Sequence, residues 1–304
     1  MREWAGRGVY FGTSSWKYAG WLGQIYARER YLTRGRFSPR QFEQRCLEEY
    51  VETFPTVCGD FSFYQFYRAE YWQKLFAQVP ATFKFGFKAP EDITTPRFSQ
   101  QARYGPKAGQ ENPDFLNAGR FTAEFLDRLA PWRQQVGYIV LEFPQFHRAT
   151  AESNARFLEQ LDGFLGQLPA GWPLGVEMRT KSLLGPDYFA CLRRHGVAHV
   201  FNSWTHMPAI GGQLDLPDVL TAGFVVARVL LKPGRAYEQA VQAFQPYDAV
   251  RDPYPEGYRD VASLVRRARQ STPKRDAFIA VNNRFVGNAP LAISAILDEL
   301  DKPG

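Results

Sequence analysis

The sequence predicts a TIM-type (β/α)8 barrel, folded as a single α/β domain over residues 1–304. Eight apolar runs of strand length alternate with amphipathic helical patterns, and this alternation is typical of βαβ units. Several runs are apolar at every position, as in parallel strands that are buried on both faces. A doubly wound sheet is the alternative. It is less favoured because the turn after the first run, GTSSW, lacks the G-x-G-x-x-G of a dinucleotide site.

The expected strands are, in chain order, Val9–Gly12, Thr56–Phe61, Phe83–Phe87, Val136–Phe143, Leu174–Met178, Val197–Phe201, Gly223–Leu230 and Ala277–Val281. The expected helices between them are Ser38–Phe54, Glu70–Val79, Thr122–Trp132, Ser153–Leu168, Pro186–His195, Tyr258–Arg269 and Pro290–Leu300. The first helix has the clearest start, because Ser38 can cap it, Pro39 suits its first position and Gln41 completes a capping box. The Gly-rich segment Gly211–Thr221 predicts no firm helix.

Two segments are longer than a barrel loop needs. An Arg-rich insert, Ala27–Phe37, follows the first strand, and a second insert, Thr94–Gly119, follows the third. A barrel places the loops that follow its strands on the face that carries the active site. We therefore expect Thr94–Gly119 to be a lid.

Charge and cysteine content limit the classes of partner. The net charge is +6, from 37 basic and 31 acidic residues. This is compatible with an anionic substrate and does not establish nucleic-acid binding. For the densest basic stretch, Ala27–Arg45, a solvated face is favoured over a polyanion contact. Three distant cysteines, the lack of an apolar leader and the lack of a bilayer-length apolar run predict a cytoplasmic protein without a membrane partner.

Polar residues follow every predicted strand. In a barrel these positions converge on one face, so we expect a polar pocket there. The residues are, strand by strand, Thr13, Ser14, Ser15 and Trp16; Asp60, Ser62 and Tyr64; Lys88 and Asp92; Glu142; Glu177 and Arg179; Asn202, Trp204 and His206; Arg228 and Lys232; Asn282, Asn283 and Arg284.

Two carboxylates are the candidate catalytic residues. Glu142 ends an apolar run, and Glu177 lies two residues before Arg179, so both members of this pair face one side of a strand. A structural ion pair is the alternative, although buried pairs are costly unless well hydrogen-bonded. We expect either carboxylate to act as a general acid or base. The expected substrate-binding residues are Trp16, Tyr18, Tyr64, Lys88, Arg179, Asn202, Trp204, Arg228, Asn282, Asn283 and Arg284.

The segment NNRFVGNAP after the last strand suggests a phosphate site. Asn288 can cap the last helix, and barrels often bind phosphate at a helix start beside the last strands. Arg284, Lys232 and Arg235 would supply the cations. No cofactor or metal site is predicted, because His147, His199 and His206 lack ligand spacing. A divalent metal held by Glu142, Glu177 and one histidine remains an alternative.

The segments GTSSWKYAGWLGQIY, FYQFYRAEYWQKLFAQVPATFKFGFKAPEDIT, GVEMR, LRRHGVAH and VNNRFVGNAP resemble the domain of unknown function 72 family (YecE-like). The resemblance spans most of the chain. It implies a TIM barrel and no established activity. It maps family positions onto Gly12, Thr13, Trp16, Tyr18, Trp21, Phe63, Tyr64, Lys88, Glu177, Arg179, Arg228, Asn282 and Asn283.

The chain departs from the family pattern at several positions. Many members have Val-Glu-Ile-Asn where this chain reads Val57 to Asp60, and Asp60 could replace that glutamate. Many have Gln at the position of Glu142, and the aromatic-containing segment usual after Arg179 reads TKSLL. With the two inserts, these differences suggest a larger subfamily that has its own substrate.

Four functions follow as hypotheses. The first is an enzyme, hydrolytic in type, that acts on an anionic, phosphorylated or nucleotide-like small molecule. The second is a carbohydrate-acting enzyme that uses Glu142 and Glu177 as paired carboxylates. The third is a nucleic-acid binding or repair protein, and the fourth is a ligand-binding barrel without catalysis. The sequence leaves the substrate, the reaction and the oligomeric state open.

Overall fold

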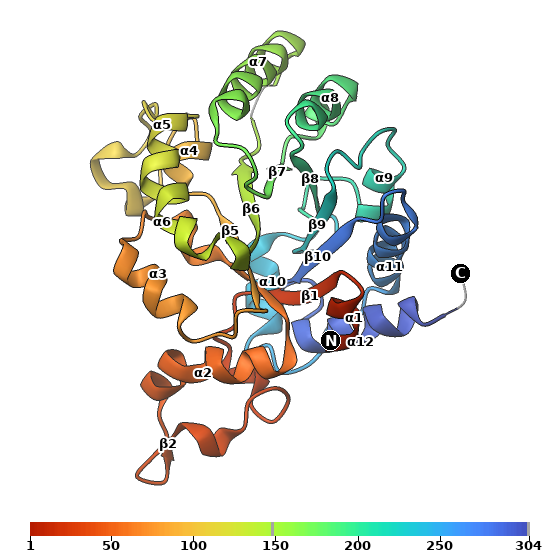
Figure 1. Cartoon of the computed structure of the whole chain (residues 1–304). Helices are drawn as coiled ribbons and strands as arrows, with labels where there is room; N and C mark the ends of the chain where they lie inside the picture. Colours follow the sequence, from red (N-terminus) through yellow and green to blue (C-terminus); the bar gives the residue numbers. More distant parts are fainter. Residues whose placement is uncertain (147–148, 303–304) are drawn as a thin grey trace.

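The computed structural model describes residues 1–146 and 149–302. Within them, eight parallel strands close a barrel in the order β1-β10-β9-β8-β7-β6-β5-β4, which confirms the predicted TIM-type fold (Figure 1). Each predicted run contains one strand, with ends that agree within two residues. The strands are β1 (Val9–Ser14), β4 (Thr56–Gly59), β5 (Lys84–Lys88), β6 (Val136–Phe143), β7 (Leu174–Met178), β8 (Ala198–Asn202), β9 (Phe224–Val229) and β10 (Asp276–Val281).

Helices surround the barrel on its outside (Figure 1). Their bounds are α1 (Arg2–Gly6), α2 (Pro39–Thr53), α3 (Ala69–Phe76), α4 (Glu91–Thr94), α5 (Ala118–Phe121), α6 (Asp127–Leu129), α7 (Ala151–Gln167), α8 (Pro186–Arg194), α9 (Ile210–Leu214), α10 (Tyr237–Phe244), α11 (Pro255–Gln270) and α12 (Ala289–Leu300). No helix in the described part of the chain is both long enough and apolar enough to cross a bilayer.

The start of α2 follows the sequence pattern only in part. The backbone N–H of Gln41 donates to the Ser38 hydroxyl at 3.3 Å, so Ser38 caps the helix. The Gln41 side chain does not complete the capping box, because its oxygen accepts from the Thr33 hydroxyl at 3.2 Å instead. Further along α2, the buried Tyr50 hydroxyl accepts from the N–H of Thr13 and donates to the carbonyl of Thr56, both at 3.0 Å. This one phenol ties α2 to β1 and β4.

The predicted helix Thr122–Trp132 is broken into short turns. A π-helical turn at Thr122–Leu126 follows α5, and a 3-10 turn at Ala130–Gln135 follows α6. Pro131 lacks the N–H that a continuing α-helix needs. The π turn changes the helical phase, and both Phe125 and Leu126 are fully buried.

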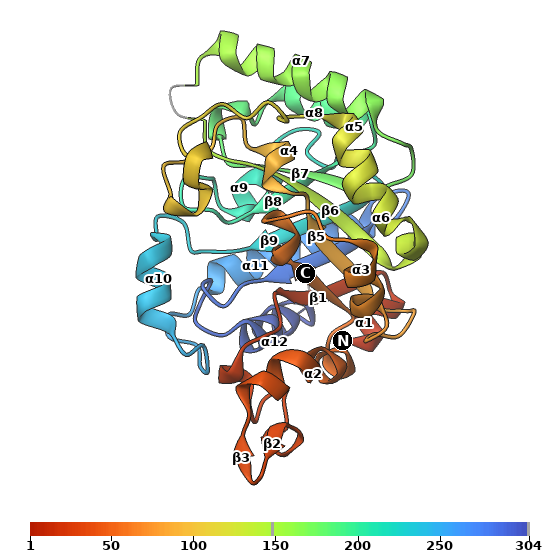
Figure 2. The same ribbon diagram turned by 90° about the vertical axis from the view of Figure 1, so that its left-hand side faces the viewer.

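The two inserts take different forms. Residues 27–37 fold into a 3-10 turn (Arg28–Tyr31) and a small antiparallel hairpin of β2 (Leu32–Thr33) and β3 (Arg36–Phe37). Figure 2 shows this hairpin projecting from the molecule beyond α2. Residues 94–119 form an irregular loop, which contains a 3-10 turn at Ala102–Lys107.

Strand phase determines which side chains enter the barrel. On β6, Tyr138 and Val140 pack in an inner cluster with residues such as Val226 of β9, whereas Ile139 and Leu141 pack outward against the helices. Continuing the two-residue period places Glu142 and Arg228 on the inner side, at the carboxyl ends of their strands. The alternation that builds the core therefore also points these charges at the barrel axis.

Candidate functional site

An ionic centre lies at the carboxyl ends of the strands. Glu142 on β6 and Glu177 on β7 are register partners, so their side chains leave adjacent strands at the same height. Arg228 enters from β9, on the other side of β8. Its Nη1 donates to Glu142 Oε2 at 2.6 Å and also to Glu177 Oε2, and its Nη2 lies 3.2 Å from Asp60 Oδ1. One guanidinium thus joins three carboxylates.

Two more cations complete the centre. Arg179 Nη2 lies 2.7 Å from Glu142 Oε2 and 2.9 Å from Glu177 Oε1. Lys88 Nζ lies 2.9 Å from Glu142 Oε2. Three cations therefore face three carboxylates, and the charges within the centre balance. The ion pair of Glu177 with Arg179, which the sequence left as the alternative to a site role, is present as part of a network rather than as an isolated pair.

Most side chains of the ionic centre are buried. Glu177 is 0% exposed, Arg228 2%, and Glu142 and Lys88 6% each. Burial raises the pKa of Glu142, but the charges of Arg179, Lys88 and Arg228 outweigh it and hold the pKa well below the ordinary value. Burial likewise opposes the charge of Arg228, and the carboxylates around it hold its pKa well above the ordinary value. Glu142 is therefore a carboxylate at neutral pH.

Arg228 and its neighbours lead into a cleft of about 510 Å³, a size suited to a metabolite. The cleft is lined by Asp60, Phe63, Tyr64, Lys88, Gln101, Arg103, Glu142, Arg179, Trp204, Arg228, Leu230, Leu231, Tyr237, Glu238 and Arg284. Seven of the residues predicted from the sequence as catalytic or substrate-binding line it, namely Tyr64, Lys88, Glu142, Arg179, Trp204, Arg228 and Arg284. Glu177 lies behind them as a partner of Arg179 and Arg228.

Four of the five cations that line the cleft lie over aromatic rings. Such contacts hold a cation in place without neutralising its charge. The pairs, with the distance from the cationic group to the ring centre, are Lys88 over Phe63 (3.6 Å), Arg179 over Trp204 (3.9 Å), Arg284 over Tyr237 (4.5 Å) and Arg103 over Tyr64 (5.1 Å). Two of these rings, Trp204 and Tyr64, belong to residues that the sequence suggested for substrate binding, and each lies under a cation of the cleft.

The insert 94–119 reaches the cleft, as expected of a lid. Its Gln101 and Arg103 line the cleft. The Arg103 guanidinium donates to both oxygens of the buried Glu91, at 3.1 and 2.8 Å, and the Tyr104 hydroxyl donates to Glu91 Oε2 at 2.6 Å. Glu91 therefore holds this end of the insert over the cleft.

Several predicted substrate-binding residues lie outside the cleft lining. Trp16 is 5% exposed and packs edge-on against Phe61. Tyr18 packs on Trp21, with ring centres 4.9 Å apart, and burial raises its pKa to about 12. Trp16 is therefore core, and Tyr18 is a neutral phenol packed in an aromatic cluster.

The strand-end asparagines bind backbone. Asn202 Oδ1 accepts from the N–H of Trp204 at 3.2 Å, and Asn282 Oδ1 accepts from the N–H of Arg284 at 2.9 Å. These are Asx turns, which fix the chain two residues beyond each asparagine. Asn202 and Asn282 therefore position cleft residues, and no signal in one sequence separates this role from ligand contact.

The start of α12 is filled by protein groups. Asn288 Oδ1 accepts from the N–H of Leu291 at 2.9 Å, as a capping residue does. Asn283 Oδ1 accepts from the N–H of Ala289 at 2.8 Å and from Trp21 Nε1 at 3.2 Å. The helix start that the sequence suggested for phosphate is thus already occupied.

Two of the three cations expected at that phosphate site are also occupied. Arg235 binds Asp252, and Lys232 Nζ lies 3.8 Å from the same carboxylate. Arg284 alone of the three lines the cleft.

The histidines take no part in the ionic centre as far as the structure describes them. His199 is buried between Tyr188 and Gln213, 3.2 Å from each. His206 does not line the cleft, and His147 lies outside the described residues. Within the described residues, no group of three or more His, Cys, Asp and Glu is placed to hold a metal ion.

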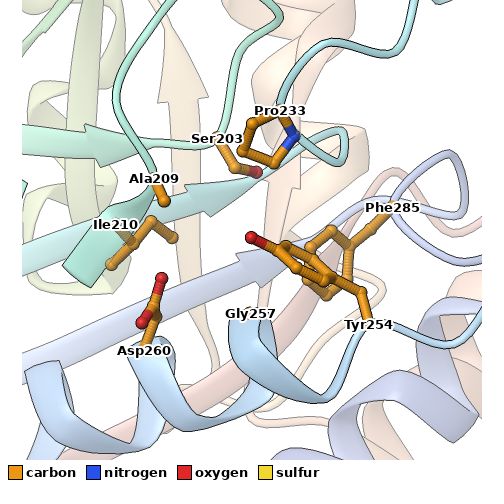
Figure 3. A pocket seen from close by; sticks show the side chains of 8 residues that line it. All are labelled: Ser203, Ala209, Ile210, Pro233, Tyr254, Gly257, Asp260 and Phe285. Atoms are coloured by element: carbon orange, nitrogen blue, oxygen red, sulfur yellow. The ribbon is translucent and has the colours of Figure 1, made fainter. Parts of the chain in front are cut away.

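A second cavity lies beside the barrel, between the β8 end and α11. Figure 3 shows the Tyr254 hydroxyl pointing into the space between Ser203 and Asp260. Its volume is only about 10 Å³, which is room for one water at most. This cavity is too small for a metabolite, whereas the ionic cleft has the volume and lies at the carboxyl ends of the strands, so the ionic cleft is the candidate functional site.

Sequence reasoning missed the rim of the cleft. Tyr237 and Glu238 begin α10, Leu230 and Leu231 follow β9, and Arg103 lies in the insert. Only Arg103 had a signal, because the insert was expected to cover the site. Leu230 is the last residue of the predicted seventh strand, and the others lie beyond it, in segments without a distinctive pattern.

Fold and cleft together define a TIM-barrel protein with an ionic centre at the carboxyl ends of its strands. The chain belongs to the family described as protein of unknown function DUF72, whose model matches residues 10–304. This confirms the family resemblance of the sequence. A comparison with curated proteins found no match.

Solved structures of the family share this fold. A DUF72 family protein from Thermotoga maritima is 18% identical, with a TM-score of 0.61, over 97% of this chain and 99% of its own. One from Enterococcus faecalis is 15% identical, with a TM-score of 0.61, over 97% and 96%. A D-tagatose 3-epimerase-like protein is 11% identical, with a TM-score of 0.50, over 84% and 92%. At these identities the likeness is one of fold alone.

Proposed function

We propose that the protein is an enzyme that hydrolyses a small anionic substrate, phosphorylated or otherwise acidic, in this cleft. The observation that carries the proposal is that the Arg284 side chain lacks a partner in the described part of the protein. Its guanidinium is half-buried in the cleft over Tyr237 and has no hydrogen-bond or ion-pair partner among the described residues. The other four cations of the cleft are each bound to a carboxylate.

A half-buried guanidinium with no acceptor is unfavourable, since desolvation of a charged donor is compensated only by a partner. Its five N–H donors suit the oxygens of a phosphate or carboxylate. An anionic group of the substrate therefore supplies the missing acceptor. Arg284 is the anchor in this proposal, whereas Lys88, Arg179 and Arg228 belong to the ionic centre.

The lining favours attack by water. Among the lining residues that the structure describes there is no serine, threonine, cysteine or histidine to act as a nucleophile. Glu142 reaches the cleft and is ionised, so it can accept a proton from water but cannot donate one. A substrate anion that draws Lys88 and Arg179 away from Glu142 would raise its pKa and make it a stronger base. Glu177, fully buried, would keep both arginines oriented.

The carbohydrate hypothesis has less support in this geometry. A glycosidase pair needs one protonated carboxyl group and space for the sugar between the two. Here one nitrogen of Arg228 binds both Glu142 and Glu177, and Glu177 is 0% exposed.

The three cysteines are free and buried, which supports the proposal that the protein works in the reducing cytoplasm.

Anion binding is tested first by thermal shift at constant ionic strength, with phosphate, pyrophosphate and citrate as probes. We expect at least one of them to raise the unfolding midpoint of the wild type. Arg284→Gln should abolish the shift, whereas Arg259→Gln, an exposed arginine of α11 paired with Glu256, should keep it. If no anion shifts the wild-type midpoint, the proposal is wrong.

Catalysis is tested with p-nitrophenyl phosphate, bis(p-nitrophenyl) phosphate and p-nitrophenyl acetate. Glu142→Gln should remove turnover and retain the anion shift. Turnover that survives Glu142→Gln would contradict its role as the base. A wild type that binds anions but releases no nitrophenol would support the ligand-binding alternative.

A further inference from the structure

The projecting hairpin concentrates the positive charge of the chain. Residues 27–45, which comprise the hairpin segment (27–37) and the start of α2, contain six arginines and two glutamates, an excess of four charges in a chain whose net charge is +6. The hairpin stands away from the barrel beyond α2 (Figure 2), and none of its residues lines the cleft. The proposed enzymatic function therefore does not account for it.

The base of the hairpin is held firmly. Tyr31 is 2% exposed and donates to Glu49 Oε2 at 2.6 Å. Tyr26 and Tyr31 pack edge-on against Phe42, with ring centres 5.1 and 5.0 Å away. The N–H of Ser38 donates to the Tyr31 carbonyl at 2.8 Å. The hairpin is thus a fixed projection, and its arginines are presented in defined places.

Only two of the six arginines are neutralised within the described chain. Arg30 pairs with Glu49 and Glu52, and Arg45 pairs with Glu48. The other four are exposed and form no ion pair with the described residues. They are Arg28, Arg34, Arg36 and Arg40.

The tip carries an arginine where folding alone favours another residue. Arg34 and Gly35 form the two-residue turn between β2 and β3, with φ of 53° and 73°. Turns with two left-handed residues prefer Asn-Gly, and a residue with a bulky side chain in that conformation costs about 1 kcal/mol. Arg34 therefore weakens the turn while adding a charge at its most exposed point.

We propose that this hairpin docks onto the phosphate backbone of duplex nucleic acid. Guanidinium groups bind phosphate oxygens in pairs of hydrogen bonds, and a two-stranded ribbon fits the width of the major groove. Single strands are recognised by stacking of bases on open rings. The rings here are buried, apart from Phe37, which Arg28 covers at 5.3 Å.

An acidic protein partner fits the hairpin less well. Protein interfaces are built around an apolar centre with aromatic anchors. The hairpin exposes one large apolar side chain, Leu32, at 38%. Its surface is otherwise mainly arginine, which matches a polyanion recognised by charge.

The test is fluorescence anisotropy with a labelled DNA duplex of about 20 base pairs, titrated between about 50 and 200 mM salt. Four phosphate contacts predict a slope of roughly −3 to −4 in a plot of log K against log salt. The double variant Arg34→Asn/Arg36→Gln should reduce the slope to roughly −2 and weaken binding about tenfold or more at low salt. Asn suits the left-handed position, so the unfolding midpoint should not fall and lost binding cannot be ascribed to a damaged turn.

A matched control removes the same charge elsewhere. Arg128→Gln/Arg259→Gln changes two exposed arginines outside the hairpin and should leave the slope unchanged. If this control weakens binding as much as the hairpin variant, net charge and not the hairpin governs binding, and the proposal fails. It also fails if single-stranded DNA, poly-glutamate or phosphatidylserine vesicles bind more tightly than the duplex, or if none of them binds at all.

Discussion

Glu142 and Glu177 are neighbours across β6 and β7, and both bind the same nitrogen of Arg228. The cleft reaches Glu142 and Arg228, whereas Glu177 lies behind them with no exposed surface. The three side chains consequently behave as one unit. Removing any member changes the charge environment of the other two.

Arg228→Leu should lower the free energy of unfolding by about 3–5 kcal/mol, because it leaves buried carboxylates without a partner. Urea denaturation of wild type and variant measures this. The double variant Arg228→Leu/Glu177→Leu should be less destabilised than Arg228→Leu alone, since it also removes the most buried of the orphaned charges. A double variant that is less stable than the single would show that Arg228 is held by something other than Glu177.

The sequence was informative about the barrel because the core and the site depend on the same two-residue strand period. Charged residues that end or interrupt apolar runs, such as Glu142, Glu177 and Arg228, had to point at the barrel axis or break the core. The sequence could not show which atoms of these residues contact one another. Asn202 and Asn282 bind backbone groups, and Tyr237 reaches the cleft from a helix that no strand pattern places.

The pH dependence of stability should report on Glu142. Its folded pKa is below its ordinary value of 4.5, so the folded state holds fewer protons on it than the unfolded state as acid is added. Its contribution to stability is therefore complete above about pH 4.5 and is lost as pH falls below that value. The difference between the urea midpoints of wild type and Glu142→Gln should narrow as the pH is lowered from 7 to 3. Parallel curves would contradict the lowered pKa.

His199 should change the stability of the fold over a different pH range from Glu142. Burial lowers its pKa from 6.5 to about 4, so between these values the unfolded state binds a proton that the folded state does not. Stability is then complete above pH 6.5 and falls by about 3 kcal/mol as pH approaches 4. His199→Gln should therefore flatten the dependence of the urea midpoint on pH across this range. A wild-type slope in His199→Gln would place the titrating group elsewhere.

Variants of Asn283 test whether this strand-end residue stabilises the fold or contacts a ligand. Its Oδ1 accepts from Trp21 Nε1 and the Ala289 N–H, and its buried Nδ2 has no partner. Asn283→Leu orphans both donors and should cost about 2–4 kcal/mol of unfolding free energy. Asn283→Asp retains an acceptor at the start of α12 and should cost less, because that helix end favours negative charge. If Asn283→Leu instead leaves urea stability intact and abolishes the anion-induced thermal shift, Asn283 binds ligand.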